Sequence, residues 1–212
     1  MKGYILDLCS GSKSMSSFNK DLKYVSLDIE KKYEPDILTD ILKWDYKEYF
    51  KKNGFPLFIW FSPPCNEYSI LNYSRPNKIP NIKYANSLVE KGKEIINYAK
   101  CFFVIENPAT GTLKNQGILD FVPFTIVDYC RYGFSYKKST ILFNNLNYEG
   151  KTCLKDKCEF VKNGRHEYSI GNSTYKTNVK ETGDKKTRLE QRYAVPKKLL
   201  EEINEVFINL LS

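Results

Sequence analysis

Short apolar runs alternate with longer amphipathic segments along this chain, and this alternation limits the fold more than any other feature. Four compact runs, rich in β-branched and aromatic residues, are predicted to be buried strands: Tyr4–Leu8, Tyr24–Ile29, Leu57–Phe61 and Phe102–Ile105. Apolar residues recur at helical spacing over Asn81–Ala99, which predicts an amphipathic helix between the last two strands. Strands that alternate with helices predict an α/β fold with an open, mostly parallel sheet.

The second half of the chain predicts fewer elements. Phe124–Tyr129 and Thr140–Phe143 are predicted to be antiparallel strands joined by the loop Tyr132–Ser139, and a final helix is expected to open at Pro196. Beyond residue 143 the pattern gives way to polar, lysine-rich sequence, typical of either a small subdomain or a long loop. Because 212 residues are too few for two ordinary domains, we expect one domain, residues 1–143 and 188–212, with a small basic insert at 144–187.

Positive charge is concentrated in one part of the chain. There are 33 Lys and Arg against 25 Asp and Glu, a net charge of +8, and residues 151–200 hold 13 basic and 6 acidic side chains. Such a block predicts a polyanionic partner, most simply nucleic acid, although a solvated lysine-rich face is the commoner origin of such charge.

The apolar segments exclude a membrane protein. The longest apolar run has only about seven residues, too few to span a bilayer. Asp7 interrupts the N-terminal segment before the core of a signal peptide can form. We therefore expect a cytoplasmic protein with its six cysteines reduced. A reduced cysteine can fill the core, bind a metal or act as a nucleophile.

Three strand ends carry residues suited to a nucleoside. Cys9-Ser10-Gly11 follows the first strand, where glycine would let the backbone approach a ligand, although a plain strand–helix turn is the commoner origin of such a sequence. Asp28 ends the second strand, where a carboxylate can bind a ribose diol or simply cap the next helix. Asp40 could accept a hydrogen bond from an adenine amino group. Together, in this order, they favour a cofactor site.

Two further strand ends favour covalent chemistry. Pro63-Pro64 would hold the chain rigid and present Cys65 above the sheet, which a core-filling thiol does not require. Glu106 leaves the neighbouring strand, where a partly buried carboxyl suits proton donation, or where it could simply start a helix.

The ordered motifs resemble those of the cytosine-C5 methyltransferases, and the compact forms found in phages and other mobile elements are most similar. The resemblance covers residues 4–143 and 188–210 and rests on these segments: Asp7-Leu8-Cys9-Ser10-Gly11, Asp28, Asp40-Ile41, Pro63-Pro64-Cys65, Glu106-Asn107-Pro108, Tyr132–Phe143 and Ala194-Val195-Pro196.

The resemblance implies a Rossmann-like methyltransferase fold that uses S-adenosyl-L-methionine and acts on DNA. It implies that Cys65 is the nucleophile that adds to carbon 6 of cytosine, and that Glu106 protonates the ring at N3. A base in a duplex would have to be flipped out. By position, the cofactor-binding residues would be Asp7, Cys9, Gly11, Asp28, Ile29, Asp40, Ile41 and Pro63.

The chain departs from the family pattern in its basic loop. Lys138 stands where the family usually has the first of two arginines, and could still supply positive charge near the cytosine O2, while the second arginine is replaced by Thr140. Cys9 stands where phenylalanine is frequent. The insert is also much smaller than the usual target-recognition domain. An RNA methyltransferase and a catalytically inactive nucleic-acid-binding relative therefore remain alternatives.

The insert has a possible metal site of its own. Cys153, Cys158 and His166, with Cys130 from the end of a nearby strand, offer the three thiols and one imidazole that tetrahedral zinc can use. The spacing is less regular than in paired CxxC knuckles. The alternative is a set of incidental thiols in a basic loop that meets phosphates through Lys155, Lys157, Lys162 and Arg165.

Overall fold

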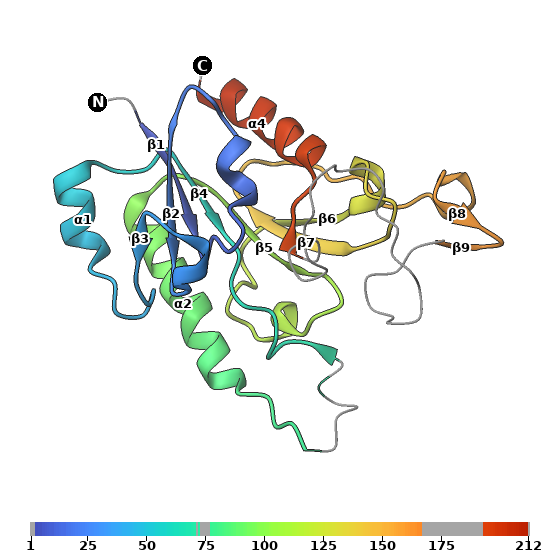
Figure 1. Cartoon of the computed structure of the whole chain (residues 1–212), viewed down its shortest axis with the longest axis horizontal. Coiled ribbons are helices and arrows are strands. Elements are labelled where there is room, and N and C mark those ends of the chain that lie inside the picture. The colour runs from blue at the N-terminus through green and yellow to red at the C-terminus, as the bar shows by residue number, and fades with distance from the viewer. Residues whose placement is uncertain (1–2, 71, 73–76, 167–192, 212) are drawn as a thin grey trace.

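The computed structural model describes residues 3–70, 72, 77–166 and 193–211 (Figure 1). Its strands are β1 Tyr4–Leu8, β2 Lys23–Asp28, β3 Ile37–Leu38, β4 Phe58–Phe61, β5 Phe102–Pro108, β6 Phe124–Asp128, β7 Ser139–Asn144, β8 Val161–Lys162 and β9 Arg165–His166. The helices are α1 Tyr46–Asn53, α2 Ile82–Ala99 and α4 Lys197–Leu211. Single 3-10 turns are η1 Ser14–Ser17, η2 Lys31–Tyr33, η4 Leu113–Asn115, η5 Tyr129–Tyr132 and η6 Lys155–Lys157.

Seven strands form the main sheet, in the order β3-β2-β1-β4-β5-β7-β6. The strands β1 to β5 pair in parallel, and β7 runs antiparallel to both of its neighbours, β5 and β6. The predicted α/β sheet, mostly parallel with one antiparallel strand, is thus confirmed. The strands β1, β2 and β3 follow one another toward one edge of the sheet, and β4 and β5 follow toward the other, so the order reverses between β1 and β4. In sheets of this kind, ligands bind at such a switch point.

The sheet is covered on both faces (Figure 1). One apolar core contains Leu6 and Phe61 with residues of α1 and α2, and the other contains Ile5 and Trp60 with residues of η1 and α4. Neighbouring residues of a strand enter opposite cores because side chains alternate along a strand. Gly92 lets α2 lie close to β4, since a Cβ atom there would come within 2.1 Å of the ring of Phe61.

The last described helix joins the core that the start of the chain begins. The rings of Phe18 and Phe207 lie 6.0 Å apart, and Asn19 donates a 2.8 Å hydrogen bond to Asn204. Pro196 precedes α4 and accepts from the backbone amide of Leu199, as expected for a proline at a helix start. The α4 helix therefore packs on the main sheet.

Several predicted boundaries were wrong. The strand β5 continues through Pro108, so Glu106 lies inside the strand, opposite Leu142 of β7, rather than beyond its end. The strand β6 stops at Asp128, and Cys130 lies on the turn η5. Both boundaries are set by pairing with β7. Pairing with β7 continues to Pro108 and so extends β5 by three residues, and the last pair between β6 and β7 is Asp128 with Ser139, where β6 ends.

Only part of the predicted insert is described. Residues 144–166 contain η6 and the two-stranded β8–β9 sheet, whereas residues 167–192 lie outside the described part of the chain. The division into residues 1–143 and 188–212 with an insert at 144–187 stays a prediction. Among the described residues, no helix is both long enough and apolar enough to cross a membrane.

Candidate active site

A cavity of about 1160 Å³ opens at the carboxyl ends of β1, β2, β4 and β5. It brings together every residue that the sequence predicts for the cofactor and for catalysis: Asp7, Cys9, Gly11, Asp28, Ile29, Asp40, Ile41, Pro63, Cys65, Glu106 and Lys138. This volume exceeds the usual range of about 300–1,000 Å³ for small-molecule sites, so there is room for a cofactor and a base together.

The turn after β1 is fastened to the end of β2 through Asp28. Gly11, with a left-handed φ of 47°, donates its backbone N–H to Asp28 Oδ2 at 2.8 Å, and Glu30 donates its own to Oδ1 at 2.8 Å. Each carboxylate oxygen keeps a second lone pair that can accept from a ligand. Asp28 therefore holds the local backbone and can still bind a ribose, so its structural role does not exclude a role in ligand binding.

Ser10 is a cavity residue that the sequence did not single out. Its Oγ is buried and has no hydrogen-bond partner in the described chain, although the residue lines the cavity beside Gly11. A buried hydroxyl without a partner is costly, and a ligand would remove that cost. The signal in the sequence was a serine between Cys9 and the glycine of a strand-end turn.

Burial changes the ionisation of two residues at this turn. It raises the pKa of Asp7 to about 7, although the Tyr24 hydroxyl, which donates to Asp7 Oδ2 at 2.6 Å, works in the opposite direction. It also raises the pKa of Cys9 well above its usual value. Cys9 is consequently held as a neutral thiol, unlike a nucleophile.

The Pro-Pro-Cys loop is held by the residue next to Glu106. Asn107 donates from Nδ2 to the carbonyl oxygen of Pro63 at 3.1 Å, and the carbonyl of Cys65 accepts from the Tyr68 amide at 3.1 Å. The buried hydrogen bond between Asn107 and Pro63 joins β5 directly to the loop that follows β4. It explains why Cys65 and Glu106, 41 positions apart in the sequence, face one cavity. The amide of Asn107 is a site residue that the motif contained but that had no predicted role.

Glu106 receives two donors on the same oxygen. The hydroxyl of Tyr129 lies 3.3 Å from Glu106 Oε1, and Lys138 Nζ lies 3.5 Å from it. Lys138 Nζ also lies 4.7 Å from the centre of the Tyr129 ring. The carboxylate is thus paired within the protein and not isolated. Tyr129, which is fully buried, could not be identified from sequence because nothing there shows which residues β7 brings beside β5.

The basic loop places Lys138 at the wall of the same cavity, where its ammonium group pairs with Glu106. The predicted position of Lys138 near the cytosine O2 stays a prediction. Thr140, at the position of the family's second arginine, is fully buried in β7 between Pro108 and Val127. It therefore cannot replace that arginine as a donor to a base.

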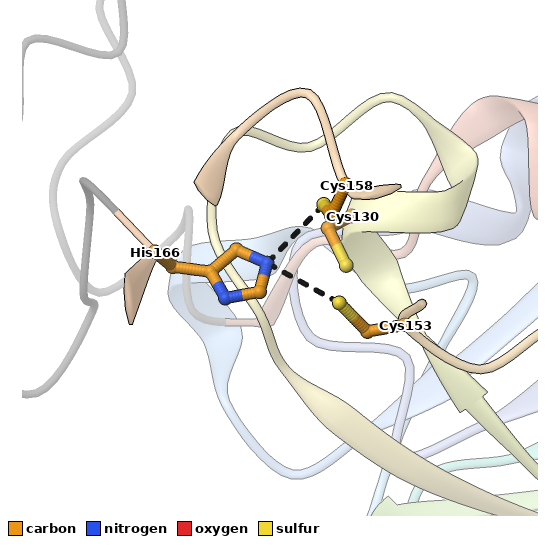
Figure 2. A group of neighbouring side chains, drawn as sticks. All are labelled: Cys130, Cys153, Cys158 and His166. Atoms are coloured by element: carbon orange, nitrogen blue, oxygen red, sulfur yellow. Dashed lines mark hydrogen bonds between the residues drawn. The ribbon is translucent and has the colours of Figure 1, made fainter. Parts of the chain in front are cut away.

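The predicted metal ligands also lie together (Figure 2). The four ligand atoms of Cys130, Cys153, Cys158 and His166 all lie within 4.8 Å of one another. His166 Nε2 is 3.6 Å from Cys153 Sγ and 3.4 Å from Cys158 Sγ. Tetrahedral zinc, with bonds of about 2.3 Å to sulfur and about 2.0 Å to nitrogen, would place these atoms about 3.5 Å apart. The side chains therefore fit such an ion with little movement.

Comparison with known proteins agrees with these observations. The chain is 30% identical, over 94% of its own length and 97% of the relative's, to a probable DNA (cytosine-5)-methyltransferase of Frog virus 3 (isolate Goorha). No protein-family model matches it.

Two solved structures are also similar. The Entamoeba histolytica methyltransferase EhMeth superposes with a TM-score of 0.51 at 15% identity, covering 72% of this chain and 56% of that one. A mutant of Spodoptera frugiperda DNMT2 gives a TM-score of 0.47 at 18% identity over 72% and 55%. The chain spans about half the length of these two proteins. EhMeth confirms the expected methyltransferase fold, and the extent of the viral match shows that the chain belongs to the DNA (cytosine-5)-methyltransferase family.

Proposed function

We propose that this protein transfers a methyl group to carbon 5 of cytosine in DNA. One observation carries the proposal: Cys65, in the loop after β4, and Glu106, within β5, line the same cavity as Gly11, Asp28 and Asp40. This arrangement supports the action of a nucleophile and an acid beside residues suited to a nucleoside. Membership of the family supports the choice of reaction.

S-adenosyl-L-methionine is the methyl donor that membership of this family implies. When bound, it supplies an electrophilic methyl group. We propose that Asp28 accepts hydrogen bonds from the ribose of the cofactor. Gly11 would let the cofactor approach the protein backbone, and the cofactor would supply the hydrogen-bond partner that Ser10 Oγ lacks. Ile29, which is 60% exposed at the cavity, would cover the adenine.

Cys65 and Glu106 would act together on the base. The Cys65 thiolate adds to carbon 6 while Glu106 donates a hydrogen bond or proton to N3, which makes carbon 5 nucleophilic. After methyl transfer, loss of the proton from carbon 5 allows Cys65 to leave. Lys138 would keep Glu106 in place until the base enters, since both already share a contact at 3.5 Å.

We further propose that the Cys130, Cys153, Cys158 and His166 cluster binds one zinc ion with a structural role. Four protein ligands leave no open position for chemistry, as in structural zinc sites. Elemental analysis should find about one zinc per chain, absent from a Cys153→Ser, Cys158→Ser variant but retained in Cys101→Ser. Cys101 is a free thiol outside the cluster.

The substrate and the compartment follow from charge and from the thiols. The basic residues of the insert favour a polyanion. None of the six cysteines, all of which lie in the described part of the chain, forms a disulfide bond, and both the nucleophile and the zinc ligands need reduced sulfur. We therefore propose a reducing compartment such as the cytoplasm of a host cell.

A covalent trap tests the proposed reaction. With S-adenosyl-L-methionine present, DNA that contains 5-fluorocytosine should stay attached to the protein on a denaturing gel, because fluorine prevents the final elimination. Cys65→Ala should form no adduct and transfer no methyl group, while binding the cofactor almost normally. The control Cys101→Ala also replaces one cysteine, outside the cavity, and should behave as the wild type.

The outcomes separate the alternatives. Methyl transfer to cytosine-containing RNA but not to DNA would change the substrate and keep the mechanism. Nucleic-acid binding with no transfer to either would identify an inactive relative. Turnover by Cys65→Ala would disprove the covalent mechanism.

A further inference from the structure

The metal cluster and the active site lie on two sides of one short turn. Cys130, a cluster residue, follows Tyr129 directly in η5, and the Tyr129 hydroxyl donates to Glu106 Oε1 at 3.3 Å. Tyr129 is fully buried and Glu106 is 9% exposed, so water competes little with this bond. Any movement of Cys130 is therefore transmitted to Tyr129 over a single peptide unit.

Asp128 joins the cluster to the same hairpin by a second route. Its Oδ2 accepts from the backbone amide of Cys153 at 2.7 Å and lies 3.5 Å from Lys137 Nζ, and its Oδ1 accepts from Ser139 Oγ. Asp128 and Ser139 are the two ends of the loop that connects β6 to β7. One buried carboxylate thus fixes both ends of this loop and the first cluster cysteine of the insert.

The loop between these ends carries both donors to Glu106. The Tyr129 backbone amide donates to the carbonyl of Lys138 at 3.1 Å, which closes the loop, and Lys138 Nζ meets Glu106 Oε1 at 3.5 Å. Because both donors meet Oε1, a proton on this carboxyl group is favoured on the other oxygen, Oε2. The loop would therefore decide which oxygen of Glu106 serves the base.

We propose that metal binding at the Cys/His cluster positions the Glu106 carboxyl group, with Tyr129 as the positioning residue and Lys138 beside it. This inference rests on the proposed function, in which Glu106 acts on cytosine. The bound metal fastens Cys130 to Cys153, Cys158 and His166, and so holds the insert against η5. The insert would then contribute to catalysis without touching the base.

Removal of the Tyr129 hydroxyl is the first test. Tyr129→Phe should lower kcat by about ten-fold or more while leaving the KM for S-adenosyl-L-methionine and the DNA affinity unchanged. The matched control is Tyr46→Phe, in which a buried tyrosine also loses a hydroxyl that donates to a glutamate, Glu94, at 2.6 Å, outside the cavity lining. Equal kcat values for the two variants, or a loss confined to KM, would overturn the role of Tyr129.

Removal of the metal is the second test. Chelation of the purified protein should speed amide hydrogen exchange in residues 129–138 and lower kcat, zinc should restore both, and exchange in β1 and β2 should stay slow. Chelation should lower the kcat of Tyr129→Phe much less, because both changes act through one contact. Unchanged exchange in 129–138, or no zinc in the protein, would overturn the inference. The exchange measurement decides the matter even if the wild type proves inactive on nucleic acids, a result that contradicts the proposed function alone.

Discussion

The two carboxylate oxygens of Asp28 that we propose to accept hydrogen bonds from the ribose also accept hydrogen bonds from the protein backbone. Because both backbone bonds to Gly11 and Glu30 end on this carboxylate, its removal affects the turn as well as the ligand. A substitution that keeps the shape is therefore more informative than alanine.

Asp28→Asn should weaken S-adenosyl-L-methionine binding by about 1.5–3 kcal/mol, the usual contribution of hydrogen bonds to a charged group. Calorimetry of the variant measures this change. Asp21→Asn, an exposed change on the loop before β2, serves as the control. Unchanged affinity in Asp28→Asn would place the ribose elsewhere.

Asp7 should make stability depend on pH. Burial raises the pKa of Asp7 in the folded protein to about 7, above its unfolded value of 3.8, so between these two pH values the folded state holds a proton that the unfolded state has lost. Stability from this group should therefore fall as pH rises, by up to about 1.4 kcal/mol per pH unit, and level off above pH 7.

Asp7→Asn cannot ionise and still accepts from Tyr24, so its stability relative to the wild type should grow between pH 5 and 7. Urea unfolding at several pH values measures the difference. A difference that does not change with pH would show that Asp7 titrates normally.

At the scale of single residues, the sequence predicted the two groups that we propose to react, and it did not predict the residues that hold them. Cys65 and Glu106 could be singled out because a thiol after two prolines and a carboxyl group following an apolar strand are unusual, and both line the cavity. Asn107 and Tyr129 act only through contacts made across the sheet. The Asn107 contact depends on the pairing of β4 with β5, and the Tyr129 contact depends on how β7 pairs with β5 and β6.

Among the elements, α1 is the helix that the sequence analysis missed. Its signal was local: Asp45 caps the helix by accepting from the Glu48 amide at 3.0 Å, and a glutamate three residues after a cap is a common helix start. The helices α2 and α4 were predictable because burial of one face imposes a helical period on the sequence, and the central strands were predictable because burial on both faces gives short continuous apolar runs. The two-residue strands β3, β8 and β9 are too short to show either pattern.

Gly92→Ala should destabilise the protein even though alanine favours helices. A Cβ atom would lie 2.1 Å from the Phe61 ring in a fully formed core, so α2 or β4 must shift, at a cost of about 1–3 kcal/mol. The control Asn97→Ala changes an exposed position of the same helix. Thermal unfolding compares the two, and a stabilised Gly92→Ala protein would show that the helix can move away freely.

For the whole molecule, the distribution of charge predicts how nucleic acid binds. If four phosphates are neutralised, the logarithm of the affinity should fall with the logarithm of salt concentration at a slope of about −3 to −4. Changing Lys155, Lys157 and Lys162 together to Gln should flatten the slope for any sequence and leave cofactor affinity unchanged.

The matched control carries the same loss of charge on α1, through Lys47→Gln, Lys51→Gln and Lys52→Gln, three exposed changes outside the cavity lining. Fluorescence anisotropy over a salt series measures both slopes. Equal slopes for the two triple variants would show that the three lysines of the insert do not contact the phosphates.

The pairing of α4 with η1 joins residues that a ribosome makes far apart in time. Phe207 meets Phe18 across 189 positions, and translation adds roughly 5–20 residues per second. The apolar face that holds Ile5 and Phe58 therefore stays exposed for on the order of ten seconds or longer. A nascent chain during that interval is a target for chaperones, and we expect it to gain activity only after α4 has left the ribosome.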